Sequence, residues 1–170
     1  KETIATFVFP AVDDQLSDKW LGGGAQEFML GVANVFKDAG SIDAALDLLE
    51  TAERPLALVG KGMAWARAET EVRDFIDRTQ IPFVRSPMGK GVVPDDHPLS
   101  AGAARTLALQ QADVIFLMGA RFNWIFHFGL PPRFSKDVKV IQLDIEPEEI
   151  GHNKRSEVAL VGDGKAIMGQ

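Results

Sequence analysis

The stretch that decides the fold is Leu58–Glu69, LVGKGMAWARAE, in which Gly60-Lys61-Gly62 separates an apolar run from a helix-like segment. The apolar run begins at Pro55. A strand, a glycine turn and a helix in this order are typical of α/β proteins that hold a phosphate at the helix N-terminus. The stretch therefore poses a choice between a nucleotide site and a tight turn that carries a lysine.

Further apolar runs extend this pattern to the end of the chain. Short buried strands are expected at 55–59, 81–86 (IPFVRS), 113–120 (DVIFLMGA), 138–145 (VKVIQLDI) and 157–163 (EVALVGD). Helices are expected from an N-cap at Ser41, with Ile42, Ala45, Leu46 and Leu49 on one face, and then at 66–79, 102–112, 147–153 and from Gly164 onward. Strands that are apolar on both faces and alternate with helices predict a parallel sheet covered by helices on each side.

Residues 1–40 differ from the rest and show no chemistry. Thr3–Phe9 is expected to form a strand, the three glycines at 22–24 break the chain, and 28–36 has helical spacing with Gly40 as its stop. We therefore divide the chain into an unassigned N-terminal arm, 1–40, and one α/β domain, 41–170. A chain that lacks an initiating Met is interpreted as a fragment or a processed product.

Composition excludes several classes of function. The 170 residues carry 18 basic and 24 acidic side chains, with a net charge of −6 and no Lys/Arg cluster, so we expect no nucleic-acid partner. The absence of cysteine excludes disulfides and thiol catalysis. No apolar stretch approaches the ~18 residues of a membrane helix, and the opening residues do not resemble a signal peptide. The three histidines lack metal-ligand spacing, and no catalytic set is apparent.

The first two strand ends give an incomplete nucleotide signature. After the first strand, Gly60-Lys61-Gly62 begins a G-x-G-x-x-G pattern, but Trp65 replaces the third glycine. A plain strand-to-helix turn fits Gly60-Lys61-Gly62 equally well. After the second strand, Arg85 stands where an NAD site would place an acid, so we interpret it as a solvated loop residue. Trp20, Trp65 and Trp124 are interpreted as core or interface residues.

The last three strand ends carry charged groups. Arg121 suits a phosphate, with an ion pair as the alternative, and Asp144 suits ribose hydroxyls, with a helix cap as the alternative. Asp163, in Gly162-Asp163-Gly164, is expected in a turn that also caps the last helix. The carboxyl ends of parallel strands meet at one edge of the sheet, so Lys61, Arg121, Asp144 and Asp163 together predict a nucleoside diphosphate site.

Four long runs resemble a known family: LVGKGMAWARAE, IPFVRSPMGKGVVPDDHP, GAARTLALQQADVIFLMGARFNWIFHFGLPPRF and KVIQLDIEPEEIGHN. They resemble the central domain of thiamine-diphosphate-dependent 2-hydroxyacyl-CoA lyases and of the related oxalyl-CoA decarboxylases. The resemblance covers 41–170, and the string GARFNWIFHFGLPPRF favours the lyase. It implies a three-layer, Rossmann-like α/β fold.

The resemblance also implies a ligand and its contacts. The central domain binds ADP in oxalyl-CoA decarboxylase and holds FAD in acetolactate synthases. The ADP contacts carry over onto Lys61 and Gly62 in GKG, Arg121 in GAR, Asp144 and Ile145 in LDI, and Asp163 in VGD. Residues 1–40 do not match the upstream family sequence, which supplies a further ADP-binding arginine.

The resemblance places the chemistry outside this chain. Thiamine diphosphate and Mg²⁺ bind between subunits in the two outer domains, so no catalytic or metal residue is expected here and the chain alone is expected to be inactive. The full enzyme is implied to be a homo-oligomer that converts a 2-hydroxyacyl-CoA to formyl-CoA and an aldehyde, in the peroxisome or the cytoplasm. The alternatives are an oxalyl-CoA decarboxylase central domain, a scaffold with an empty nucleotide site, and a NAD- or FAD-dependent oxidoreductase.

Overall fold

The structure is a computed structural model that describes residues 39–170, and Gly40–Gln170 form one compact unit. The strand expected at Thr3–Phe9 and the helix expected at 28–36 lie outside the described residues. Within them, no helix combines the length and the apolar character that crossing a membrane requires.

Five parallel strands form one sheet. They are β1 (Pro55–Val59), β2 (Phe83–Arg85), β3 (Val114–Met118), β4 (Lys139–Asp144) and β5 (Val158–Val161), in the spatial order β2-β1-β3-β4-β5. This confirms the predicted α/β fold. Chain progression reverses between β1 and β3, which makes their carboxyl ends the topological switch point where such sheets bind ligands.

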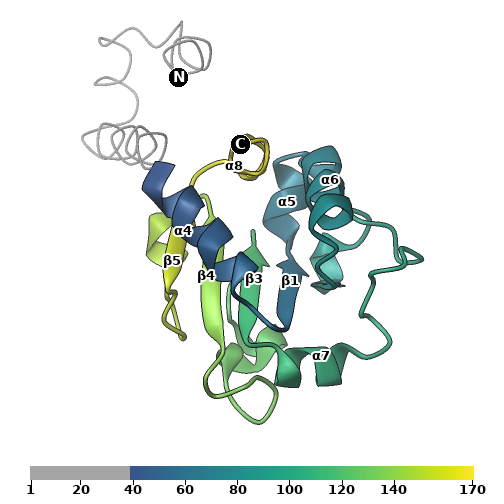
Figure 1. Ribbon diagram of the computed structural model, residues 1–170, viewed down its shortest axis with the longest axis vertical. Helices are drawn as coiled ribbons and strands as arrows, with labels where there is room; N and C mark the ends of the chain where they lie inside the picture. Colours follow the sequence, from purple (N-terminus) through teal and green to yellow (C-terminus); the bar gives the residue numbers. More distant parts are fainter. Residues whose placement is uncertain (1–38) are drawn as a thin grey trace, which may run out of the picture. The chain divides into compact units, whose positions relative to one another are not determined.

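Within residues 39–170, five helices and three 3₁₀ turns flank or connect the strands. The helices are α4 (Ala39–Glu50), α5 (Lys61–Trp65), α6 (Glu69–Thr79), α7 (Arg105–Gln111) and α8 (Gly164–Met168). The 3₁₀ turns are η1 (Pro87–Gly89), η2 (Trp124–Gly129) and η3 (Pro147–Glu149). Figure 1 shows α5 and α8 at the end of the sheet where β1 and β5 finish.

Several helix predictions need correction. The helix expected at 66–79 begins only at Glu69, because Arg67 adopts a left-handed φ of 53° between α5 and α6. The helix expected at 147–153 is only the turn η3, since Gly151 has a φ of 74° that a helix does not allow. Gly40 and Ser41 lie inside α4, so neither a stop at Gly40 nor an N-cap at Ser41 is correct, and Leu46 is 47% exposed while Ala45 and Leu49 are buried.

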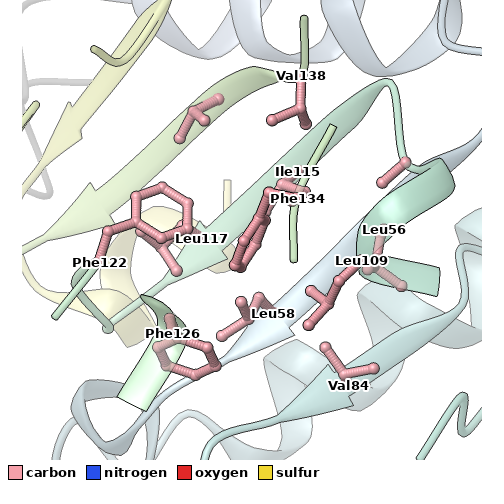
Figure 2. Packing of buried hydrophobic residues seen from close by; sticks show 12 residues of the cluster. Leu56, Leu58, Val84, Leu109, Ile115, Leu117, Phe122, Phe126, Phe134 and Val138 are labelled. Carbon is pink, nitrogen blue, oxygen red and sulfur yellow. The ribbon is translucent and has the colours of Figure 1, made fainter. Parts of the chain in front are cut away.

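Helices cover both faces of the sheet, as predicted. On one face, Phe75 of α6 meets Phe116 of β3 edge-on at 5.6 Å between ring centroids. On the opposite face, Leu109 of α7 packs in one cluster with Ile115 and Leu117 of β3. Figure 2 shows three rings of the β3–β4 connection, Phe122, Phe126 and Phe134, in this second cluster.

The turn after β1 packs directly on the end of β3. The Gly60 N–H donates to the carbonyl of Met118 at 2.8 Å, and the Gly62 N–H donates to the carbonyl of Gly119 at 2.9 Å. A Cβ atom on Gly60 would lie 2.2 Å from the Gly119 oxygen, and one on Gly62 would lie 2.7 Å from the Gly119 Cα. Gly119 itself has a φ of 55°. These glycines therefore allow two backbones to touch.

This contact predicts that Gly60→Ala destabilises the domain by about 2–3 kcal/mol, because the added methyl group overlaps backbone that cannot move aside. Gly60 has an ordinary extended φ of −104°, so the loss would report the close approach alone. Gly102→Ala is the matched control, since its Cβ would meet only the Ser100 hydroxyl at 3.5 Å. Equal urea-unfolding midpoints for the two variants would contradict this interpretation.

Candidate functional site

A cleft of ≈580 Å³ lies at the carboxyl edge of the sheet, over the switch point. The turns after β1, β3, β4 and β5 and the 3₁₀ turn η1 line it. All six residues singled out in the sequence line this cleft: Lys61, Gly62, Arg121, Asp144, Ile145 and Asp163. The structure thus brings together side chains that are as much as 102 positions apart in the sequence, from Lys61 to Asp163.

The two cations of the cleft already have neighbours. The Lys61 ammonium lies 4.2 Å from the ring centroid of Trp65, a cation–π contact on the exposed rim. The Arg121 guanidinium donates to the Glu149 carboxylate, so the ion pair that the sequence left open is present. Both cations remain exposed, with 58% of the Arg121 side chain open to solvent.

The Asp144 carboxylate lies half-buried at the end of β4. Burial raises its pKa above the ordinary value, and the neighbouring Glu149 raises it further. The N–H groups of Glu146 and Ile145 and the charge of Arg121 oppose this rise. Asp144 does not cap η3, which has Glu146 at its N-cap position, but it accepts a hydrogen bond from the Glu146 N–H at 3.1 Å.

Asp163 and Gly62 have structural roles that limit what they offer a ligand. The Asp163 carboxylate accepts from the Ala166 N–H at 2.9 Å, which confirms the predicted cap of α8. The Gly62 N–H is committed to Gly119, and it is therefore not a free donor at the start of α5. Lys61, Arg121 and Asp144 thus remain the charged groups of the predicted set that do not cap a helix.

Several lining residues were not found from the sequence. Met88 of η1 and Trp65 of α5 supply exposed apolar surface, with 61% and 76% exposure. Trp124 is 74% exposed, so neither Trp124 nor Trp65 belongs to the core, and the interface interpretation is the one that remains open for them. Glu149 was also missed, because it lies five residues beyond the end of β4.

The interpretation of Arg85 as a solvated loop residue was wrong. Arg85 ends β2 and is held in a short ion pair with Asp95, where its guanidinium holds the pKa of the Asp95 carboxyl below the usual range. It does not line the cleft. His97 likewise has a packing role, with its Nε2 atom 3.0 Å from the Asp77 carboxylate and its ring against Phe83.

Within residues 39–170, no three histidine or acidic side chains converge as metal ligands. The Asp163 carboxylate accepts its hydrogen bond from the start of α8.

Sequence comparison decides the family. The family described as "Thiamine pyrophosphate enzyme, central domain" matches residues 42–170. The chain belongs to this family. Its parallel sheet, with a cleft at the switch point, is the structure of such a domain.

The central domain is also similar to parts of three curated proteins. It is 52% identical over 133 residues to 2-hydroxyacyl-CoA lyase 1 of Mus musculus, covering 78% of this chain and 23% of that protein. It is 54% identical over 127 residues to 2-hydroxyacyl-CoA lyase of Oryza sativa subsp. japonica, covering 75% of this chain and 22% of that protein. It is 49% identical over 128 residues to oxalyl-CoA decarboxylase of Escherichia coli K12, covering 75% of this chain and 22% of that protein. The chain thus spans less than a quarter of the length of these relatives.

The raised pKa of Asp144 predicts how Asp144→Asn changes stability with pH. A carboxyl that holds its proton more tightly when folded makes the folded chain bind more protons than the unfolded chain, so stability falls as the pH rises above the ordinary carboxyl pKa of 3.8. The amide removes this loss and keeps the acceptor for Glu146. Urea unfolding near pH 3 and near pH 7 would test it. We expect the free energy of unfolding of the variant, relative to wild type, to be higher near pH 7 than near pH 3, and the reverse order would contradict the shift.

Proposed function

We propose that this domain binds ADP in the cleft at its switch point. The observation that carries the proposal is the convergence of Lys61, Arg121 and Asp144 on one cleft of ≈580 Å³. Arginine and lysine suit phosphate oxygens, and a carboxylate suits ribose hydroxyls. The volume lies within the range of small-molecule sites.

Each cleft residue has a proposed place in ADP binding. Lys61 and Arg121 contact the two phosphates from the ends of β1 and β3. Asp144 keeps unused acceptor sites beyond its bond to Glu146 and accepts from the ribose hydroxyls. Ile145 is 49% exposed and gives the adenine an apolar surface at the rim. Asp163 and Gly62 shape the site more than they bind, since each is already hydrogen-bonded within the fold.

We propose that the whole protein is a thiamine-diphosphate- and Mg²⁺-dependent 2-hydroxyacyl-CoA lyase that gives formyl-CoA and an aldehyde. The similarity to the lyases of Mus musculus and Oryza sativa supports this. The similarity to oxalyl-CoA decarboxylase supports the second candidate activity. In either case this domain contributes ligand binding and part of a homo-oligomer, without a catalytic group, and is inactive alone. Comparing formyl-CoA release from a 2-hydroxyacyl-CoA and from oxalyl-CoA by the full-length protein separates the two activities.

A scaffold domain without a nucleotide is favoured by one observation, the Arg121–Glu149 ion pair. Calorimetric titration of the chain with ADP, NAD and CoA separates the proposals. Selective ADP binding supports the nucleotide site, whereas a folded chain that binds none of the three supports the scaffold. Preference for NAD would revive the oxidoreductase alternative.

The ADP site predicts that Asp144→Ala and Arg121→Ala each weaken ADP binding by about 1–3 kcal/mol, because each removes hydrogen bonds to a charged group. Arg78→Ala is the matched control, since Arg78 lies in α6 and does not line the cleft. Calorimetry at one ionic strength gives the three affinities. If neither cleft variant differs from the control, these residues do not contact the nucleotide.

A further inference from the structure

Glu149 is the acid that lies closest to the proposed phosphate contacts. Its carboxylate accepts from the Arg121 guanidinium inside the cleft, and only 23% of its side chain is exposed. A carboxylate and a phosphate offer the same planar fork of guanidinium donors similar oxygen acceptors. Glu149 therefore occupies the position on Arg121 that a ligand phosphate would need.

A buried amide fixes the backbone of Glu149. Gln142 in β4 is 1% exposed, and its Nε2 donates to the Glu149 carbonyl at 2.8 Å. Its Oε1 accepts from the Gly151 N–H at 2.9 Å and from the Ser156 hydroxyl at 2.8 Å. The Glu149 N–H donates to the Glu146 carbonyl at 3.1 Å. Glu149 is therefore held at the cleft, unlike a mobile carboxylate on an exposed loop.

The charges that line the cleft show how Glu149 affects an entering phosphate. Two cations, Lys61 and Arg121, share the lining with four carboxylates, which are Asp144, Glu146, Glu149 and Asp163. Asp163 is engaged with α8, and Asp144 lies near enough to Glu149 for that charge to raise its pKa. An entering phosphate thus meets a net acidic cleft in which one of the two cations, Arg121, is already paired with Glu149.

We infer that Glu149 is a specificity-determining residue of the cleft, which competes with ligand phosphates for Arg121 and so sets how strongly phosphate charge contributes to binding. This inference rests on the proposed function. A ligand that lacks phosphates leaves the ion pair in place, and a diphosphate displaces the carboxylate. The position of Glu149 thereby lowers the affinity of the cleft for anions that cannot displace its carboxylate from Arg121.

The test compares Glu149→Gln with Glu148→Gln in the full chain by calorimetry. Glu148 lies in the same turn η3, is exposed and does not line the cleft, so it matches the charge change without touching Arg121. Because exposed or half-exposed ion pairs are weak, we expect Glu149→Gln to tighten ADP binding about fivefold. We expect adenosine affinity to stay unchanged and Glu148→Gln to match wild type. A general change in cleft shape would alter adenosine binding as well.

Adding Arg121→Ala tests whether Glu149 changes ADP affinity through its ion pair with Arg121. If Glu149 acts by occupying Arg121, the gain from Glu149→Gln is largely lost in the Arg121→Ala background. An equal gain in both backgrounds, or no gain in either, overturns the inference while the ADP site stands. If wild type does not bind ADP but Glu149→Gln does, the inference holds and the proposed function fails for the wild-type chain. If neither chain binds ADP or inorganic pyrophosphate, both are wrong.

Discussion

The close contact between the turns after β1 and β3 is the constraint on which the cleft depends. Two hydrogen bonds join them, and three glycines keep their backbones together with no side chain between. The contact brings Lys61, which lies between Gly60 and Gly62, and Arg121, which follows Gly119 and Ala120, to the same cleft. A bulkier turn would separate the two cations, so the glycines act by positioning side chains.

Under the proposed function, the charges of the cleft set ligand binding against the stability of the free domain. Asp144 is half-buried beside Glu149, and both burial and that neighbour disfavour its ionised form. A fold selected only for stability would not place two carboxylates together at the end of a buried strand. Such an arrangement is typical of sites whose groups serve a ligand. Under the proposed function, the cost falls on the free domain and is recovered when ligand hydroxyls pair with the acids.

The sequence predicts the sheet well, because a strand buried on both faces must be apolar throughout, as VIFLM at Val114–Met118 shows. It also predicts the cleft residues that directly follow strands. It fails where the structure depends on one dihedral angle, such as the left-handed Arg67 that separates α5 from α6. It fails as well for Glu149 and Met88, which reach the cleft from 3₁₀ turns and have no periodicity that would mark them.

Gln142 has a consequence for how this domain can change over time. One side chain ties the β4–β5 connection to the sheet and also holds the backbone of the acid opposite Arg121. Under the inferred role of Glu149, substitutions of Gln142 act on folding and on ligand discrimination together. Substitutions of Glu149 itself leave the hydrogen bonds between Gln142 and the loop intact, because these bonds reach the Glu149 backbone. On that inference, ligand preference changes more readily through the side chain at the end of η3 than through the amide beneath it.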